Sequence, residues 1–264
     1  MKKVLILLAF AFLLGSNSYA QSGIQFSHGT WSELLAKAEK ENKLIFMDAY
    51  AEWCGPCKKM AKDVFTQEEV GKFYNAKFIN VKMDMEKGEG IDLSRQYGVM
   101  AYPTLLFLNK DGEIVHRSVG YQSATLLLDL GNAALDPNRN AGGLANKYKN
   151  GDRSPELLHA YAMQLYDAMD GSYGKVAEEY LAKQQDWSSE KNMEFIFQMA
   201  NDLDSKLFDY IVQHKQAFEQ KFGEQAVAGK IEELVQGKIA KAGSEADLKA
   251  VEDFYAKTYP ERAG

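Results

Sequence analysis

Residues 53–58 read Trp-Cys-Gly-Pro-Cys-Lys, and they contain the only two cysteines of this 264-residue chain. The apolar run before them predicts a strand, and Pro56 suits the first turn of a helix because no backbone N–H is needed there. A helix that starts near Cys54 directs its free N–H groups and the positive end of its dipole at the first sulfur, which stabilises a thiolate. Cys57 then lies one turn further along, where it can resolve a mixed disulfide formed at Cys54. The pattern predicts a redox-active dithiol in a loop fixed by Gly55 and Pro56.

Two structural explanations of the cysteine pair are weaker. A disulfide this short closes a minimal loop, and the entropy that a crosslink removes from the unfolded chain grows with loop length. Half of a zinc site would need a second cysteine pair or clustered histidines. The histidines are instead scattered along the chain, at His28, His116, His159 and His214. We therefore expect neither a metal nor a cofactor.

The segments on either side of the motif resemble thioredoxin. Residues 44–53 read Leu-Ile-Phe-Met-Asp-Ala-Tyr-Ala-Glu-Trp, and residues 97–108 read Tyr-Gly-Val-Met-Ala-Tyr-Pro-Thr-Leu-Leu-Phe-Leu. The resemblance covers residues 24–135 and depends on three features in order: Asp48 in an apolar strand, the Cys-Gly-Pro-Cys loop and the Tyr102-Pro103-Thr104 segment. It implies a thioredoxin fold and thiol-disulfide oxidoreductase activity.

The resemblance also implies roles for the residues of the dithiol and its strand. Cys54 would be the attacking nucleophile, with a pKa of about 7 instead of about 8.5, and Cys57 would be the resolving thiol. Asp48 would be the buried proton acceptor that serves Cys57, and burial would raise the pKa of its carboxyl. A solvated aspartate at the strand end is the alternative. Lys82 would pair with Asp48 from the neighbouring strand, although an exposed lysine is an equally good interpretation.

Three further residues are expected around the dithiol. Trp53 matches the residue that walls the site in thioredoxins, and a core tryptophan is the alternative. Pro103 would follow a cis peptide bond, and Tyr102 would offer backbone groups to a bound peptide thiol. Tyr102 departs from the isoleucine common in thioredoxins, so we expect a different substrate preference.

Apolar periodicity and turn residues predict the order of elements up to residue 135. A capping box at Thr30–Glu33 opens a helix to about residue 41, and a second is predicted at Thr66–Glu69. We predict strands at 43–50, 78–85, 104–108 and 113–119, a turn at 109–112, and further helices after the motif, at 91–97 and at 124–135. This order predicts an α/β fold, with a central mixed sheet flanked by helices.

The second half of the chain has a different character. Residues 136–143 are rich in turn residues and are predicted to be a linker between a thioredoxin-like domain (21–135) and an all-α domain (144–264). Helical apolar faces and breaks near 170–171, 186–189, 223 and 243 predict six or so helices, and a TPR-like arrangement is one interpretation of residues 155–183. Its aromatic and methionine residues fall at helical spacing, which favours a core over a cofactor site. We expect this domain to bind another protein.

Residues 1–20 are predicted to be a cleaved signal peptide. They hold Lys2 and Lys3, an apolar run at 4–14 and a small-x-small site ending at Ala20. The run is shorter than the roughly 20 residues that a membrane span needs, so an uncleaved anchor is the weaker alternative. We therefore expect a periplasmic or secreted protein, and the Asp-Val-Phe-Thr-x-x-Glu-Val segment at 63–70 resembles periplasmic thioredoxin-like proteins. Without the two lysines the formal net charge changes from −6 to −8, which argues against nucleic-acid binding.

The Gly-Pro pair between the cysteines resembles reducing members of the family. It predicts a disulfide reductase that acts on protein disulfides and, in an oxidising compartment, takes electrons from a membrane-bound donor. An oxidase or isomerase is one alternative. A helical binding or assembly module with a vestigial thioredoxin domain is another, and the intact set of Cys54, Cys57, Asp48 and Pro103 argues against it.

Overall fold

The computed structural model describes residues 23–258. The predicted signal peptide therefore lies outside the described residues. Between residues 23 and 258, no helix is long and apolar enough to cross a membrane.

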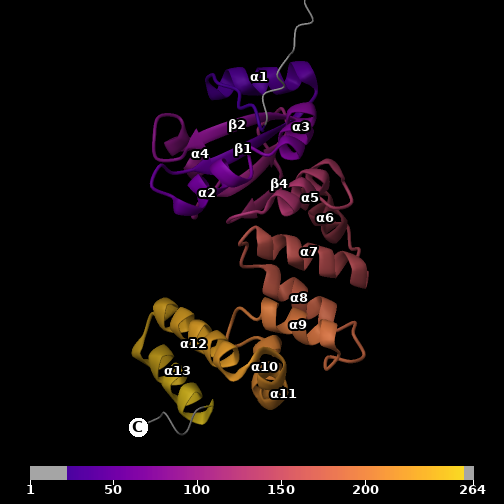
Figure 1. The fold of residues 1–264 in the computed structure, drawn as a ribbon. Coiled ribbons are helices and arrows are strands. Elements are labelled where there is room, and N and C mark those ends of the chain that lie inside the picture. Colours follow the sequence, from indigo (N-terminus) through magenta and orange to yellow (C-terminus); the bar gives the residue numbers. More distant parts are fainter. Residues whose placement is uncertain (1–22, 259–264) are drawn as a thin grey trace, which may run out of the picture.

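Four strands form one mixed sheet in the order β2-β1-β3-β4 (Figure 1). The central β1 (Leu44–Tyr50) runs parallel to β2 (Phe78–Asp84) and antiparallel to β3 (Thr104–Leu108). The edge strand β4 (Ile114–Val119) pairs antiparallel with β3. Each predicted strand is present, and its ends lie within one residue of the predicted ones.

Helices cover both faces of this sheet. One face packs against α1 (Trp31–Glu41) and α4 (Gly90–Gln96). The other packs against α2 (Gly55–Asp63), α3 (Glu68–Lys77) and α5 (Ala124–Leu135). The arrangement is that of thioredoxin, which confirms the predicted fold class.

Alternation along β1 decides where its one acidic residue lies. Ile45, Met47 and Ala49 contribute to the core under α1 and α4. Phe46 contributes to the core under α2, α3 and α5. Because successive side chains of a strand point to opposite faces, Asp48 shares the face of Phe46. The strand therefore directs its carboxylate to the side of the sheet that α2 covers.

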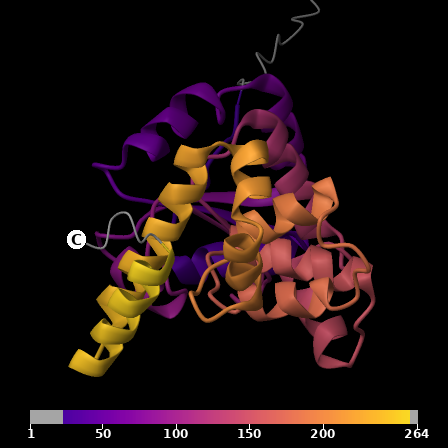
Figure 2. The same cartoon turned by 90° about the horizontal axis from the view of Figure 1, so that it is seen from below.

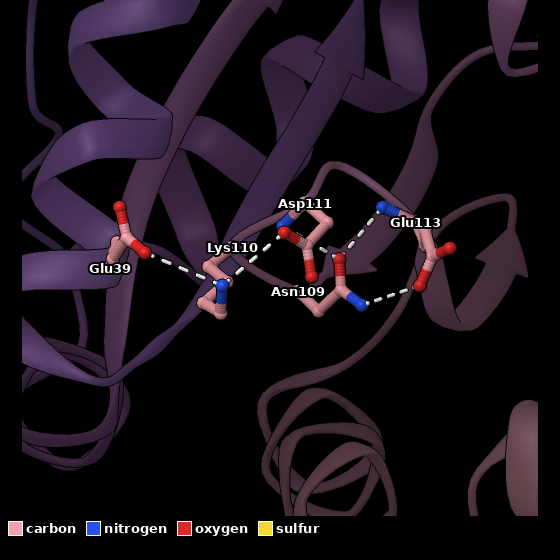
Figure 3. Close-up of polar contacts among 5 residues, drawn as sticks. All are labelled: Glu39, Asn109, Lys110, Asp111 and Glu113. Carbon is pink, nitrogen blue, oxygen red and sulfur yellow. Dashed lines mark hydrogen bonds and ion pairs between the residues drawn. The ribbon is translucent and has the colours of Figure 1, made fainter.

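The predicted turn at residues 109–112 joins β3 to β4 (Figure 3). The Asn109 Oδ1 atom accepts hydrogen bonds from the backbone N–H groups of Asp111 (3.0 Å) and Glu113 (2.9 Å). Lys110 reaches Glu39 of α1 at 3.4 Å, which ties the turn to the neighbouring helix. The short side chain of asparagine thus replaces missing backbone partners, as is typical of such turns.

The helix caps confirm one prediction and contradict another. Thr30 and Glu33 form the predicted capping box at the start of α1. The second box is absent: α3 begins after Gln67, which makes no side-chain cap. Thr66 instead donates its hydroxyl to the Lys62 carbonyl at 2.6 Å. Thr66 lies one residue before the N-cap of α3, and its hydroxyl bonds to the last turn of α2.

Eight helices follow in the described part of the chain, two more than the six or so predicted. Helices α6 to α11 follow one another roughly in chain order away from the sheet, and α12 and α13 lie to one side of them (Figure 1; seen from below in Figure 2). A break between helices occurs at each predicted position. Three further breaks, before α7, before α10 and at His214, were not predicted from the sequence. The eight helices are α6 (Ala141–Lys149), α7 (Pro155–Asp167), α8 (Tyr173–Leu181), α9 (Glu190–Met199), α10 (Lys206–Gln213), α11 (Lys215–Phe222), α12 (Glu224–Lys241) and α13 (Glu245–Thr258).

The predicted linker is shorter than residues 136–143. Helix α6 already begins at Ala141, because the Asn140 side chain caps it by accepting from the Gly143 N–H at 2.8 Å. Asn140 is buried and also donates to the Ala134 carbonyl at 3.3 Å, which joins the cap to the end of α5. Both α6 and α7 pack on β4. The helical half therefore sits directly on the edge of the sheet.

Candidate active site

The two cysteines lie at the predicted strand-to-helix junction. Cys54 is the N-cap of α2, and Gly55 and Pro56 are its first two helical residues. The sulfurs of Cys54 and Cys57 form a disulfide. The backbone N–H of Cys57 also donates to the Cys54 sulfur at 3.1 Å. In the reduced protein, this donor and the helix dipole would stabilise a thiolate at Cys54.

Asp48 and Lys82 form the expected pair beneath the motif. The two residues face each other in the parallel register of β1 and β2. The Lys82 ammonium lies 2.6 Å from Asp48 Oδ2, whereas Asp48 Oδ1 is buried with no hydrogen-bond partner. Burial raises the pKa of the Asp48 carboxyl above its ordinary value, and Lys82 partly opposes this shift. The carboxyl is therefore buried, as expected, and holds a proton more readily than a solvated aspartate.

A cavity of about 260 Å³ lies between Lys82 of this pair and the second cysteine. Its walls include Cys57 of α2 together with Lys82 and Tyr50 of the sheet. The Lys82 ammonium also lies 4.4 Å from the centroid of the Tyr50 ring. The space is large enough for several waters, each of which fills roughly 30 Å³ in the liquid. Water in the cavity could therefore contact both Cys57 and Lys82.

Trp53 stands at the mouth of the site and is not a core residue. Its side chain is 68% exposed, and its ring packs edge-on against Tyr102 with the centroids 5.8 Å apart. The indole N–H points at the Glu86 carboxylate, 2.9 and 3.0 Å from its two oxygens. Glu86 follows β2, so the loop after that strand holds the tryptophan in place.

The segment before β3 completes the site. The Tyr102–Pro103 peptide is cis, as the resemblance implied. Tyr102 packs against the buried cluster of Ala51, Cys54 and Cys57. The Pro103 carbonyl accepts from the Gly120 N–H at 2.8 Å, which fixes one end of this segment to the chain after β4.

Sequence reasoning placed the dithiol, its acid and the cis peptide together, and the structure does bring these residues to one site. It missed Glu86, which holds Trp53, and Arg117, whose guanidinium donates to the Tyr97 and Gly98 carbonyls at 2.9 Å each. Glu86 lies in a charged loop and Arg117 in an alternating strand. Both patterns also predict ordinary exposed residues, so the sequence held no signal for either.

In the described residues, no group of three or more His, Cys, Asp or Glu could hold a metal ion. A disulfide at the N-cap of a helix, with a buried carboxyl beneath it, defines a thiol-disulfide oxidoreductase.

Comparisons with known proteins agree with this class. The family model of the thioredoxin-like domain matches residues 31–135. Thioredoxin of Bacillus subtilis is 39% identical over 98 residues, which are 37% of this chain and 88% of that protein. Thioredoxin H4 of Arabidopsis thaliana is 34% identical over 94 residues, covering 36% of this chain and 74% of the relative. The solution structure of a proposed disulphide-isomerase from Bacteroides thetaiotaomicron is 48% identical, covers 44% of this chain and 95% of that one, and gives a TM-score of 0.41. The chain belongs to the thioredoxin family.

Proposed function

We propose that this protein is an exported protein-disulfide reductase. The observation that carries the proposal is the Cys54 sulfur at the N-cap of α2, where the Cys57 N–H already donates to it. Reduced Cys54 attacks a substrate disulfide as a thiolate. A bond forms between the Cys54 sulfur and one substrate sulfur, the substrate S–S bond breaks, and the other substrate sulfur leaves as a thiolate that takes a proton.

Cys57 completes the reaction. Its thiol gives a proton to the Asp48 carboxylate through water in the cavity that Cys57 shares with Lys82. The Cys57 thiolate then attacks the Cys54 sulfur, which forms the Cys54–Cys57 disulfide and releases the second substrate thiolate. Two electrons have passed from the dithiol to the substrate. The raised pKa of Asp48 favours this role, because an acceptor works best when its pKa lies near the operating pH.

Protein substrates fit the surface around the sulfurs. Trp53 is 68% exposed and Met100 is 94% exposed, which is unusual for such large apolar side chains. Because large exposed apolar side chains at a site favour contact with another protein, they support a polypeptide substrate. The helical half would then select among protein partners.

The direction of electron flow rests on the sequence of the loop. Gly55 and Pro56 resemble the reducing members of the family, whose potentials lie near −270 mV, whereas the strongest oxidant of this type lies near −120 mV. In the periplasm or outside the cell the disulfide must be reduced again after each turnover. A membrane-bound thiol donor is the partner we propose for this step.

The experiment is reduction of insulin by the purified protein with a thiol donor. Cys54→Ser should abolish turnover, whereas Ser123→Ala, at the N-cap of α5, should retain it. Full activity in the Cys54 variant would exclude the proposed nucleophile. N-terminal sequencing of the native protein tests export, since cleavage after Ala20 leaves Gln21 as the first residue.

A further inference from the structure

Arg117 fixes the end of α4 from the edge strand of the sheet. Its Nη1 donates to the Tyr97 carbonyl and its Nη2 to the Gly98 carbonyl, each at 2.9 Å. Tyr97 is the C-cap of α4, and Gly98 has a φ of +57°, so these carbonyls belong to the turn that ends the helix. The next residues, 99–103, carry the cis peptide and pack against the cysteines.

The segment 99–103 is held at its two ends, and within it the Ala101 carbonyl accepts from the Thr104 hydroxyl at 2.7 Å. At its start the Val99 N–H donates to the Ser94 carbonyl at 2.9 Å, just beyond the carbonyls that Arg117 holds. At its end the Pro103 carbonyl accepts from Gly120. Between these points the Met100 side chain is almost fully exposed. The direction in which the segment leaves α4 therefore depends on how the guanidinium orients the turn.

The helical half covers this arginine. Helix α7 packs on β4, the strand that carries Arg117 (Figure 1). The Nε atom is buried and has no hydrogen-bond partner in the part of the chain that the structure describes. Burial lowers the pKa of the guanidinium, and Asp170, in the turn between α7 and α8, opposes the shift. The guanidinium's hydrogen bonds to the two carbonyls offset the cost of burying the charge, because hydrogen bonds from a charged donor are stronger than those from a neutral one.

We propose that Arg117 is a positioning residue that presets segment 99–103 to receive the substrate polypeptide beside Cys54. It touches neither sulfur, so it acts only through the segment. A segment already in its binding conformation loses less conformational freedom when the substrate binds, which strengthens binding without changing the chemical step. The proposal rests on the reductase function proposed above.

The test compares two substrates in the full-length protein. Insulin presents a polypeptide to segment 99–103, whereas dithiobis-nitrobenzoate is a small aromatic disulfide without a peptide backbone. For Arg117→Ala we expect KM for insulin to rise about tenfold, the factor that corresponds to 1.4 kcal/mol of lost binding. The kcat for insulin and the rate with the small disulfide should stay at the wild-type values.

Two further variants complete the series. Arg117→Lys should recover part of the KM, because an ammonium can hold one carbonyl but lacks the rigid fork of a guanidinium. Arg95→Ala is the matched control: Arg95 lies on α4, its side chain is 75% exposed, and it forms an ion pair with the exposed Asp92 at 3.3 Å. It should behave like wild type. If the alanine variant does not fold, the lysine variant carries the same comparison of KM values.

Hydrogen exchange supplies a readout independent of turnover. Amides of residues 99–102 should exchange faster in Arg117→Ala, with the amides of β1 unchanged. An unchanged KM for insulin, or equal losses on the two substrates, would overturn the role of Arg117 while leaving the reductase function intact. If wild type reduces neither substrate, the proposed function itself fails.

Discussion

Replacing Asp48 by asparagine should stabilise the oxidised protein at alkaline pH. The carboxylate is fully buried, and only one of its oxygens has a partner, the Lys82 ammonium at 2.6 Å. A buried polar atom without a partner costs about 1–3 kcal/mol, and a charged one costs more. Asparagine keeps the shape but removes the charge, and Lys82 remains partly exposed and can reach water. We expect a gain of roughly 1–2 kcal/mol in the free energy of unfolding at pH 8.

The gain must depend on pH in a defined direction. Burial raises the pKa of Asp48 in the folded state, so the folded protein binds more protons than the unfolded one between the ordinary and the raised pKa. The free energy of unfolding of the wild type therefore falls as pH rises through this interval. Below the ordinary pKa, about 4, both states are protonated and the advantage of the variant disappears.

Urea unfolding of both oxidised proteins from pH 4 to pH 8 measures this difference directly. Asp63→Asn is the control, because Asp63 is exposed at the end of α2 and should show no such pH dependence. A variant that is less stable than wild type at pH 8, or a difference that does not vary with pH, would refute the description of Asp48 as a buried acid with a raised pKa.

Three other outcomes follow from the same site and its junction. Lys82→Met should raise the pKa of Asp48 further, because Lys82 lowers it by charge and by a hydrogen bond; an NMR titration of the carboxyl that shows no rise would mean that the pair does not set this pKa. His116 accepts from the Ala141 N–H at 3.2 Å, and burial lowers its pKa to about 4, so stability should be lost as pH falls from about 6.5 to about 4. This contribution to the slope should be lost in His116→Gln, so that the stability of the variant changes less with pH than that of wild type, as urea titrations would reveal. Cys57→Ala should accumulate mixed disulfides on Cys54 that mass spectrometry detects, and their absence from cells expressing the variant would count against Cys54 as the attacking sulfur.

Much of the thioredoxin half could be predicted because its signals are local. Alternating or continuous apolar runs fixed four strands to within a residue, and one capping box fixed the start of α1. The dithiol, Asp48 and the cis peptide could be placed because each belongs to a short motif. For Lys82 the sequence left two interpretations, a pair with Asp48 or an exposed lysine, because the register between β1 and β2 depends on residues far apart in the chain.

The parts that sequence reasoning missed depend on contacts between distant segments. Thr66 does not cap α3 because the helix starts one residue later than the sequence indicates, with Gln67 as its N-cap. Asn140 and the glycines after it have the composition of a linker, yet they start a helix once the end of α5 supplies a partner.

A further signal in the helical half went unused. At Asp152, Asp170, Asp186 and Asp202, the carboxylate accepts the N–H two residues later, in the turns before α7, α8, α9 and α10. This recurrence agrees with repeated helical units. The TPR-like arrangement stays a prediction.

The reduction potential of the Cys54–Cys57 pair tests the central claim most directly. Equilibration of the full-length protein with glutathione buffers, followed by mass spectrometry of the alkylated cysteines, gives the value. A reductase with Gly-Pro between its cysteines should lie near −270 mV. A value of about −150 mV or higher would contradict the account and make the protein an oxidase or isomerase.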